Sequence, residues 1–298
     1  MCLITIITPT YNRQKYLEKL YVSLKEQTCK DFRWLVVDDG STDFTKDMIK
    51  RFQADAKLDF TLQYIYQKNG GKHTALNTGI SQTETELTFI VDSDDYLPKE
   101  SIRIIKEYHE KYKNQRECFS LCGYSFLRCH ADGSVNTSYF PENEKIDSYR
   151  NVRINGNIGG DKAEVFYTEI LKKYPFPVYE GERFLPEDIV WMQMSGPYNM
   201  VHINENIYTC DYLEGGLTNS GRKMKQNSPQ GMVFRSKVYL DDKEVCLKVK
   251  VKMMLLYIIY GRFANVERKK LRQDIEQKVL FDCMYLPSMI LKKALWKS

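Results

Sequence analysis

The sequence has no apolar run long enough to cross a membrane. Its longest purely apolar run near the C-terminus covers residues 253–260, whereas a membrane-spanning helix needs about 20 apolar residues. The N-terminus, MCLITIITPTYNR, lacks a basic leader, and Pro9 interrupts its apolar stretch before the length of a secretory signal. These absences predict a cytoplasmic protein without a transmembrane helix.

Cysteine pairs of the metal-binding kind are also absent. The eight cysteines include no C-x-x-C pair, and the gaps between Cys118, Cys122, Cys129 and His130 do not match the spacing of zinc sites. We expect reduced cysteines that serve as small apolar side chains. The loop NGGKHTALN fits neither the G-x-G-x-x-G nor the P-loop pattern, which excludes the usual dinucleotide and P-loop sites there.

Neither sign of charge is strongly in excess. The chain has 44 Lys and Arg against 39 Asp and Glu, and the lysines occur in small groups. This distribution argues against nucleic acid as a partner, while a nucleotide or a membrane headgroup layer remains compatible with it. With 298 residues, of which 43% are hydrophobic, we expect a folded protein with one main domain and an appendage.

Strands and helices alternate in the first third of the chain. Unbroken β-prone runs predict buried strands at residues 3–8, 32–37, 60–66 and 87–91, separated by helices at about 14–27, after 41–43, and at 75–80. This order predicts an α/β fold with a mostly parallel nucleotide-binding sheet flanked by helices. Ligands bind beyond the carboxyl ends of such strands, where residues 8–12, 38–40, 70–72 and 92–95 converge.

The remaining two thirds are less regular. We expect a helix after Pro98, a strand at residues 120–127 that turns at ADGS into a strand at 135–139, and a helix starting near 186–188. Short strands follow at 200–203 and 207–212. A change in composition near Gly215 divides the chain into residues 1–215 and a basic, mainly helical extension at 216–298. In this extension we expect a helix from Asp241–Asp242 to residue 261, although LKVKVKM also alternates at the period of a strand.

Three carboxylates within four positions follow the fourth strand, at Asp92, Asp94 and Asp95. They would suit Mg²⁺ or Mn²⁺, which keep one or two protein carboxylates and complete their shell with water and substrate phosphate. The alternative is a helix N-terminus, where acidic residues are favoured by the helix dipole. One acid would satisfy that need, so the sequence favours a metal site.

Other strand ends offer polar groups with two interpretations each. Asp39 suits a tight turn, or it accepts hydrogen bonds from a ribose or a base on which Tyr11 stacks. Lys72 lies in a flexible loop or contacts a phosphate. The pair Glu187–Asp188 caps the following helix, or it supplies a general base; from these residues alone, capping is favoured.

In their order, these motifs resemble the inverting, nucleotide-sugar-dependent glycosyltransferases of family 2, which have the GT-A fold. The similar stretches are TPTYNR, SLKEQT, FRWLVVDDGSTD, GGKHTALNTGI, FIVDSDDYLP and PEDIVW, and they cover residues 3–195. The chain lacks the Q-x-x-R-W motif and the transmembrane helices of the longer synthases in this family. That departure argues against a processive polymer synthase.

The resemblance implies a role for each matching residue. Asp188 would be the catalytic base, with Glu187 beside it. Asp92-Ser93-Asp94 matches the D-x-D motif, in which Asp94 and then Asp92 would hold the divalent metal. The nucleotide-sugar donor would be bound by Thr8, Pro9, Tyr11, Asp39, Lys72, Asn77, Asp92 and Ser93.

The expected function is transfer of a sugar from a nucleoside-diphosphate sugar, with UDP favoured, to a glycan or lipid-linked acceptor in surface polysaccharide synthesis. A nucleotidyltransferase and a non-catalytic sugar-nucleotide or glycan-binding protein are the alternatives. The basic stretch with Arg222, Lys223 and Lys225 is either a loop that closes over the diphosphate or a solvated loop. The apolar residues 286–291 and 295–296 either pack as a helix or rest on the inner face of a membrane.

Overall fold

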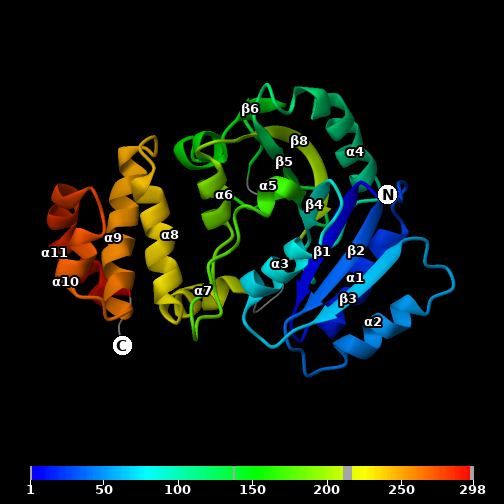
Figure 1. Cartoon of the computed structure of the whole chain (residues 1–298), viewed down its shortest axis with the longest axis horizontal. Helices are drawn as coiled ribbons and strands as arrows, with labels where there is room; N and C mark the ends of the chain where they lie inside the picture. Colours follow the sequence, from blue (N-terminus) through cyan, green and yellow to red (C-terminus); the bar gives the residue numbers. More distant parts are fainter. Residues whose placement is uncertain (1, 137, 211–216, 296–298) are drawn as a thin grey trace.

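The computed structural model describes residues 2–136, 138–210 and 217–295. The strands in these ranges form one eight-stranded sheet in the order β3-β2-β1-β4-β7-β5-β8-β6 (Figure 1). The strands are β1 (Ile4–Thr10), β2 (Phe32–Asp38), β3 (Thr61–Tyr66), β4 (Leu87–Ile90), β5 (Leu121–Cys129), β6 (Lys145–Asp147), β7 (Lys162–Tyr167) and β8 (Asn199–Thr209).

The half of the sheet nearest the N-terminus is parallel, as predicted. Strands β1 to β4 pair in parallel and are separated in sequence by α1 (Gln14–Lys25), α2 (Thr45–Gln53) and α3 (Lys72–Ser81). Every residue of β1 is buried, because helices cover both faces of the sheet. The α/β class expected from the alternation of elements is confirmed.

Alternation along β2 assigns these helices to opposite faces of the sheet. Trp34 stacks with Tyr21 of α1 and Phe52 of α2, each at a centroid distance of 6.3 Å. Val37 points the other way, because side chains alternate along a strand, and it approaches Gly79 of α3. Helices therefore cover both faces of this part of the sheet, and the carboxyl ends of β1, β2 and β4 are left accessible between them.

In the other half of the sheet, the strand expected at residues 120–127 is present as β5, but β6, β7 and the pairing of the strands were not predicted. Strand β7 lies antiparallel between β4 and β5, and β6 pairs antiparallel with β8. Strand β8 is continuous where two short strands were expected, because the polar residues 204–206 lie at an irregularity in its register with β5. The turn at residues 131–134 is present; of the strand expected at 135–139, Val135 forms a bridge with Cys129, and residue 137 lies outside the described residues.

Several helix boundaries also differ from the predictions. Helix α3 begins at Lys72, three residues earlier than expected, so Lys72 is helical. Asp241 ends a helix instead of preceding one, and Arg222, Lys223 and Lys225 lie on a helix, not on a loop. The other helices are α4 (Ser101–Tyr112), α5 (Thr168–Leu171), α6 (Asp188–Met194), α7 (Leu217–Gln226), α8 (Pro229–Asp241), α9 (Leu247–Phe263), α10 (Arg268–Gln273) and α11 (Lys278–Leu295), with single turns at Lys113–Gln115 and Arg150–Asn155.

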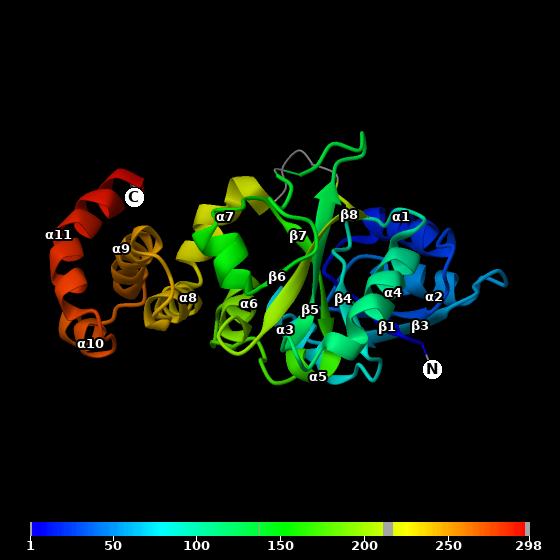
Figure 2. The ribbon, with the colours of Figure 1, turned by 90° about the horizontal axis from the view of Figure 1, so that it is seen from above.

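The C-terminal helices stack outward from α6. Figure 2 shows α8, α9 and α11 following one another away from the sheet. Arg150 binds Asp242 and Glu244 beyond the end of α8, which joins this stack to the sheet domain. The boundary expected at Gly215 lies outside the described residues. None of the helices described by the structure has the length and hydropathy needed to cross a bilayer.

Candidate functional site

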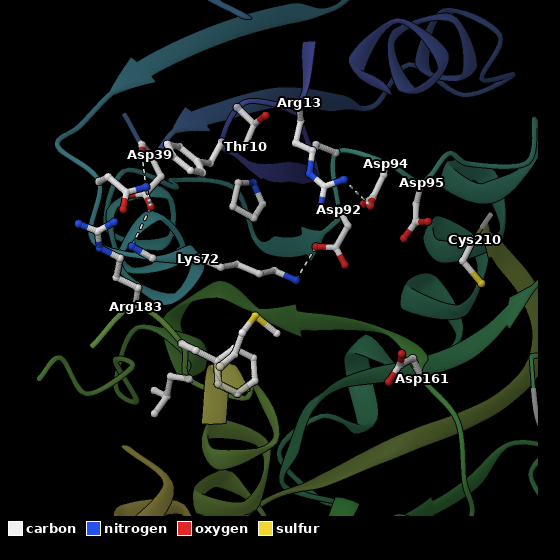
Figure 3. A pocket seen from close by; sticks show the side chains of 18 of the residues that line it. Thr10, Arg13, Asp39, Lys72, Asp92, Asp94, Asp95, Asp161, Arg183 and Cys210 are labelled. Atoms are coloured by element: carbon white, nitrogen blue, oxygen red, sulfur yellow. Dashed lines mark hydrogen bonds and ion pairs between the residues drawn. The ribbon is translucent and has the colours of Figure 1, made fainter. Parts of the chain in front are cut away.

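A cavity of about 530 Å³ lies at the carboxyl ends of β1, β2 and β4. Figure 3 shows Lys72 reaching across it toward Asp92, with Asp39 toward one end and Asp95 toward the other. This volume lies in the range of small-molecule and cofactor sites. Its lining includes Pro9, Thr10, Tyr11, Arg13, Asp39, Asn69, Gly71, Lys72, Asp92, Ser93, Asp94, Asp95, Arg128, Asn136, Asp161, Arg183, Phe184, Leu185, Cys210 and Met224.

Asp39 organises the loop that leads into α3. Its Oδ1 accepts hydrogen bonds from Gln67 Nε2 (2.8 Å) and the Gly70 N–H (2.9 Å), and its Oδ2 accepts from the Gly71 N–H (2.7 Å) and Asn69 Nδ2 (3.1 Å). A carboxylate has about four lone-pair sites, and these four bonds use them. In this structure Asp39 shapes the wall of the cavity and has no acceptor site left for a base.

Gly71 is required by the geometry of this loop. Its φ of 97° lies in the region that favours glycine, and a Cβ at this position would lie 2.2 Å from the Arg183 carbonyl oxygen. This close approach brings the segment before α6 against the start of α3. The loop therefore places Lys72 beside the residues that precede α6.

Lys72 joins the two acidic motifs. Its Nζ lies 2.5 Å from Asp92 Oδ1 and 2.7 Å from Glu187 Oε1. Burial alone would lower the pKa of Lys72, but the charges of Asp92 and Glu187 outweigh burial and raise it. For Asp92, burial opposes ionisation, while Lys72 and Arg128 lower the pKa overall. Lys72 and Asp92 are therefore both charged near neutral pH.

Asp94 and Asp95 have different surroundings. Asp94 is 28% exposed and lies 3.4 Å from Arg13 Nη1. Asp95 is 7% exposed and accepts a hydrogen bond from the Tyr208 hydroxyl at 2.6 Å. Burial and then the charge of Asp92 raise the pKa of Asp95 to about 7. Asp94 is thus more accessible to a metal ion than Asp95, which is buried and hydrogen-bonded to Tyr208.

Asp188 is the second residue of its acidic pair, and it points away from Glu187. Its carboxylate accepts hydrogen bonds from Arg235 and from the Tyr239 hydroxyl, both on α8. Successive residues at the start of a helix project about 100° apart, so Glu187 meets Lys72 while Asp188 meets α8. Asp188 is not among the residues that line the cavity.

Two other predicted donor residues lie away from the cavity lining. Thr8 is fully buried and accepts a hydrogen bond from Trp34 Nε1 at 2.9 Å, whereas Thr10 lines the cavity. Asn77 forms two 2.8 Å hydrogen bonds with the backbone of Phe176 and so anchors a distant segment. Pro9, Tyr11, Asp39, Lys72, Asp92, Ser93 and Asp94 all lie at the cavity.

The cavity also contains cations that the sequence analysis did not single out. Arg128 on β5 lies 3.9 Å from Asp92 and 4.0 Å from Asp95, with its guanidinium stacked on Tyr208. Arg13 and Arg183 line the cavity as well. Arg13 directly follows the first strand-end loop, which was a usable signal. Arg128 depends on the pairing of β5 with β7 and β8, which the sequence did not indicate.

The acidic residues fit a divalent ion that is only partly held by protein. No group of three or more His, Cys, Asp or Glu side chains suited to a metal occurs among the described residues. Magnesium and manganese need only one or two carboxylates when substrate phosphate and water supply the other ligands. Asp94, which faces the cavity, meets that requirement, while Asp92 is engaged by Lys72.

Sequence comparisons relate the chain to one enzyme family. Residues 5–128 match the family model described as "Glycosyl transferase family 2". Glycosyltransferase GlyA of Streptococcus pneumoniae is 34% identical over 232 residues, which cover 72% of this chain and 31% of GlyA. The poly(ribitol-phosphate) beta-N-acetylglucosaminyltransferase TarS of Staphylococcus aureus is 35% identical over 111 residues, which cover 35% of this chain and 19% of TarS. The chain thus spans less than a third of either relative.

Solved structures share the fold at lower identity. The structure of S. aureus TarS 1–349 with UDP-GlcNAc has a TM-score of 0.66 at 20% identity, covering 100% of this chain and 93% of that one. A mannosyltransferase from Pyrobaculum calidifontis, solved with GDP-Man and Mn²⁺, has a TM-score of 0.60 at 16% identity, covering 99% and 88%. Both similarities extend over the C-terminal helices as well as the sheet.

Proposed function

Because the chain belongs to glycosyl transferase family 2 and has its GT-A fold, we propose that it transfers a sugar from a UDP-sugar to an acceptor hydroxyl with inversion. In this proposal residues 1–215 form the catalytic domain, and residues 216–298 form an extension. The acceptor in this proposal is a glycan or lipid-linked saccharide of a surface polymer; TarS, by its name, acts on another polymer, poly(ribitol-phosphate). A complex of TarS with UDP-GlcNAc supports UDP as the carrier.

The bridge formed by Lys72 is the observation that supports this proposal most strongly. It links Asp92 of the D-x-D motif to Glu187 of the pair before α6. These acids are far apart in sequence and belong to different elements. Their convergence on one ammonium group, beside a cavity of ligand size, fits a site that holds a diphosphate and directs a second reactant toward it.

Each end of the cavity would hold a different part of the donor. Tyr11, which is 45% exposed, offers a ring on which the base stacks, and the loop ordered by Asp39 surrounds the nucleoside. Lys72 and Arg13 offer positive charge to the diphosphate. Asp94, with Asp92 nearby, would hold Mg²⁺ or Mn²⁺, which when bound offsets the charge that develops on the leaving diphosphate.

Asp188 would accept the proton of the acceptor hydroxyl. As the proton moves to the carboxylate, the acceptor oxygen forms a bond to the anomeric carbon, and the bond from that carbon to the diphosphate oxygen breaks with its electron pair. The products are a glycoside of inverted configuration and UDP. The proton then leaves Asp188 for solvent, which restores the carboxylate.

We expect UDP-GlcNAc and UDP to stabilise the protein against heat in the presence of Mn²⁺, and UDP-GlcNAc to be hydrolysed slowly to UDP without any acceptor. A ligand present at 100 times its Kd adds about 2.7 kcal/mol to the free energy of unfolding. Differential scanning fluorimetry and a UDP-release assay measure both effects. Release of pyrophosphate from UTP with a sugar phosphate would instead indicate a nucleotidyltransferase, and binding without turnover would indicate a sugar-nucleotide-binding protein.

We also propose that the C-terminal extension rests on an anionic membrane surface at the inner face of the membrane. Residues 217–298 contain 18 of the 44 Lys and Arg but 7 of the 39 Asp and Glu. On α11, four exposed residues spaced for one helix face form an apolar stripe: Val279, Cys283, Leu286 and Ile290. An apolar stripe on a basic segment fits a helix that lies at a membrane interface. A second copy of this chain fits the stripe less well, because two equally basic segments would repel each other.

Replacing Leu286 and Ile290 together by serine should weaken binding to phosphatidylglycerol vesicles at least tenfold, since each exposed aliphatic side chain loses its burial in lipid. Vesicle co-sedimentation measures this change. The matched control replaces Val22 and Phe44, which are exposed apolar residues of the sheet domain, and should bind vesicles as the wild type does. Wild-type binding by the serine variant would contradict the proposal, and a dimer lost in that variant would assign the stripe to a second copy.

A further inference from the structure

The structure assigns Arg235 and Tyr239 of α8 as positioning residues that hold Asp188 in place and select which of its oxygens receives the proton. This inference rests on the proposed function, because it concerns the same reaction. It goes beyond the family motifs, since α8 lies outside the segment that matches the family model. It makes part of the C-terminal extension necessary to the catalytic site.

The contacts define a two-sided clamp on one carboxylate. Arg235 Nε lies 2.9 Å from Asp188 Oδ1 and 3.0 Å from Oδ2, and Arg235 Nη2 also donates to Oδ2. The Tyr239 hydroxyl donates to Oδ2 at 2.7 Å. The side chains of Arg235 and Asp188 are only 17% and 20% exposed, and Tyr239 is buried. A planar guanidinium that binds both oxygens fixes the orientation of the carboxylate as well as its position.

The two carboxylate oxygens are not equally occupied. Oδ2 accepts from Arg235 Nη2 and from the Tyr239 hydroxyl, so its two lone pairs are used. Among the residues that the structure describes, Oδ1 accepts a hydrogen bond only from Arg235 Nε, which it shares with Oδ2. Oδ1 therefore keeps an acceptor site, and it is the atom that takes the proton of the acceptor hydroxyl.

The charges around Asp188 favour its ionised form. Burial on its own would raise the pKa of Asp188, but Arg235 and Tyr239, with a smaller contribution from Lys225 of α7, lower it overall. Tyr149 faces the same group from the turn before Arg150. If Arg235 were neutral, burial would be opposed only by weaker groups, so the pKa of Asp188 would rise.

The test uses the full chain, with Mn²⁺ and UDP-GlcNAc as the donor and water as the acceptor. We expect Arg235→Gln to lower kcat for UDP release at least 100-fold at pH 7, while the Kd for UDP-GlcNAc changes less than threefold. The acidic limb of its pH–rate profile should move to higher pH, because more acidic conditions then protonate Asp188. Arg235→Lys keeps the charge without the two-point contact and should recover only part of the rate.

Tyr239→Phe keeps the shape of a buried ring and removes one hydrogen bond, so it tests the clamp with little risk to folding. It should lower kcat about fivefold and move the acidic limb in the same direction by a smaller amount. Arg150→Gln is the matched control, because it breaks a buried pair between the sheet domain and the residues that follow α8, and the ion-pair partners of Arg150 are Asp242 and Glu244 instead of Asp188. Its kcat should stay within threefold of the wild type and its acidic limb should not move.

The outcomes separate this inference from the proposed function. If the wild type is active but Arg235→Gln and Arg150→Gln lower kcat equally, the clamp has only a structural role. The same conclusion follows if the acidic limb of the pH–rate profile moves in neither Arg235→Gln nor Tyr239→Phe. No UDP release by the wild type, with or without Mn²⁺, would overturn the proposed function itself. If Arg235→Gln and Tyr239→Phe both kept the kcat and the pH–rate profile of the wild type, the inference would be overturned and the proposed function would stand.

Discussion

Replacing Asp188 by asparagine is expected to reduce kcat for UDP release from UDP-GlcNAc by about 10³-fold and to leave the Kd of the donor nearly unchanged. General-base assistance contributes roughly 10² to 10⁴ in rate, and an amide cannot take the proton. Asp188 does not line the donor cavity, so the donor should bind as before. Rapid-quench single-turnover kinetics and calorimetric titration with UDP-GlcNAc measure the two quantities.

This variant also breaks the ion pair with Arg235, so its stability needs a control. Asp242→Asn breaks a comparable buried pair, because Asp242 binds Arg150 at 2.8 Å. It should lose similar stability in urea unfolding and keep kcat within threefold of the wild type. If Asp188→Asn retained a tenth or more of the wild-type kcat, Asp188 would not be the base, and Glu187 would have to be considered in that role.

The parallel half of the sheet could be predicted because its signals are local. Continuous apolar runs such as residues 3–8 and 32–37 form strands covered on both faces, and the strand-end motifs then lie at one edge. The same reasoning placed Asp92 and Lys72 at one cavity. The strand at residues 162–167 was not predicted, and the pairing of residues 199–209 could not be, since both depend on distant partners and on a register shift.

Side-chain roles were harder to predict than positions. A sequence motif marks Asp39 as a group at the cavity, but only the fold shows that four donors from residues 67–71 occupy its carboxylate. The pair Glu187–Asp188 looks like one acidic unit in the sequence. In the structure, helix geometry directs Glu187 to Lys72 and Asp188 to Arg235. No spacing rule links Asp188 to a helix that begins at Pro229.

Replacing Lys72 by methionine is expected to lower both stability and donor affinity. Methionine has nearly the same length as lysine but no charge, so the carboxylates of Asp92 and Glu187 would lose the ammonium group that lies between them. Two such charges at about 5 Å repel by roughly 3 kcal/mol at an effective dielectric of 20. Lys72 is 41% exposed, so solvent screening reduces the effect, and we expect a loss of about 1–2 kcal/mol in the free energy of unfolding at pH 7.

The dependence of this loss on pH follows from the two pKa shifts. The raised pKa of Lys72 contributes stability below its unfolded value of 10.5, and this is lost as pH rises through the folded pKa. The lowered pKa of Asp92 contributes stability above its unfolded value of 3.8, and this is lost as pH falls. The stability difference between wild type and variant should therefore be largest between these limits and should narrow below about pH 4, where protonation also removes the repulsion.

Donor affinity should fall at least tenfold in Lys72→Met, because the change removes one of the cations that, in the proposed function, bind the diphosphate. Titration with UDP in the presence of Mn²⁺ measures this loss, and urea unfolding at several pH values measures the stability term. Lys68→Met is the matched control: Lys68 is an exposed lysine of the loop that leads into α3, and its replacement should change neither quantity by more than the error. A Lys72→Met protein that binds UDP as tightly as the wild type would show that Lys72 only balances the two acids, and the diphosphate would then have to be assigned to the arginines of the cavity.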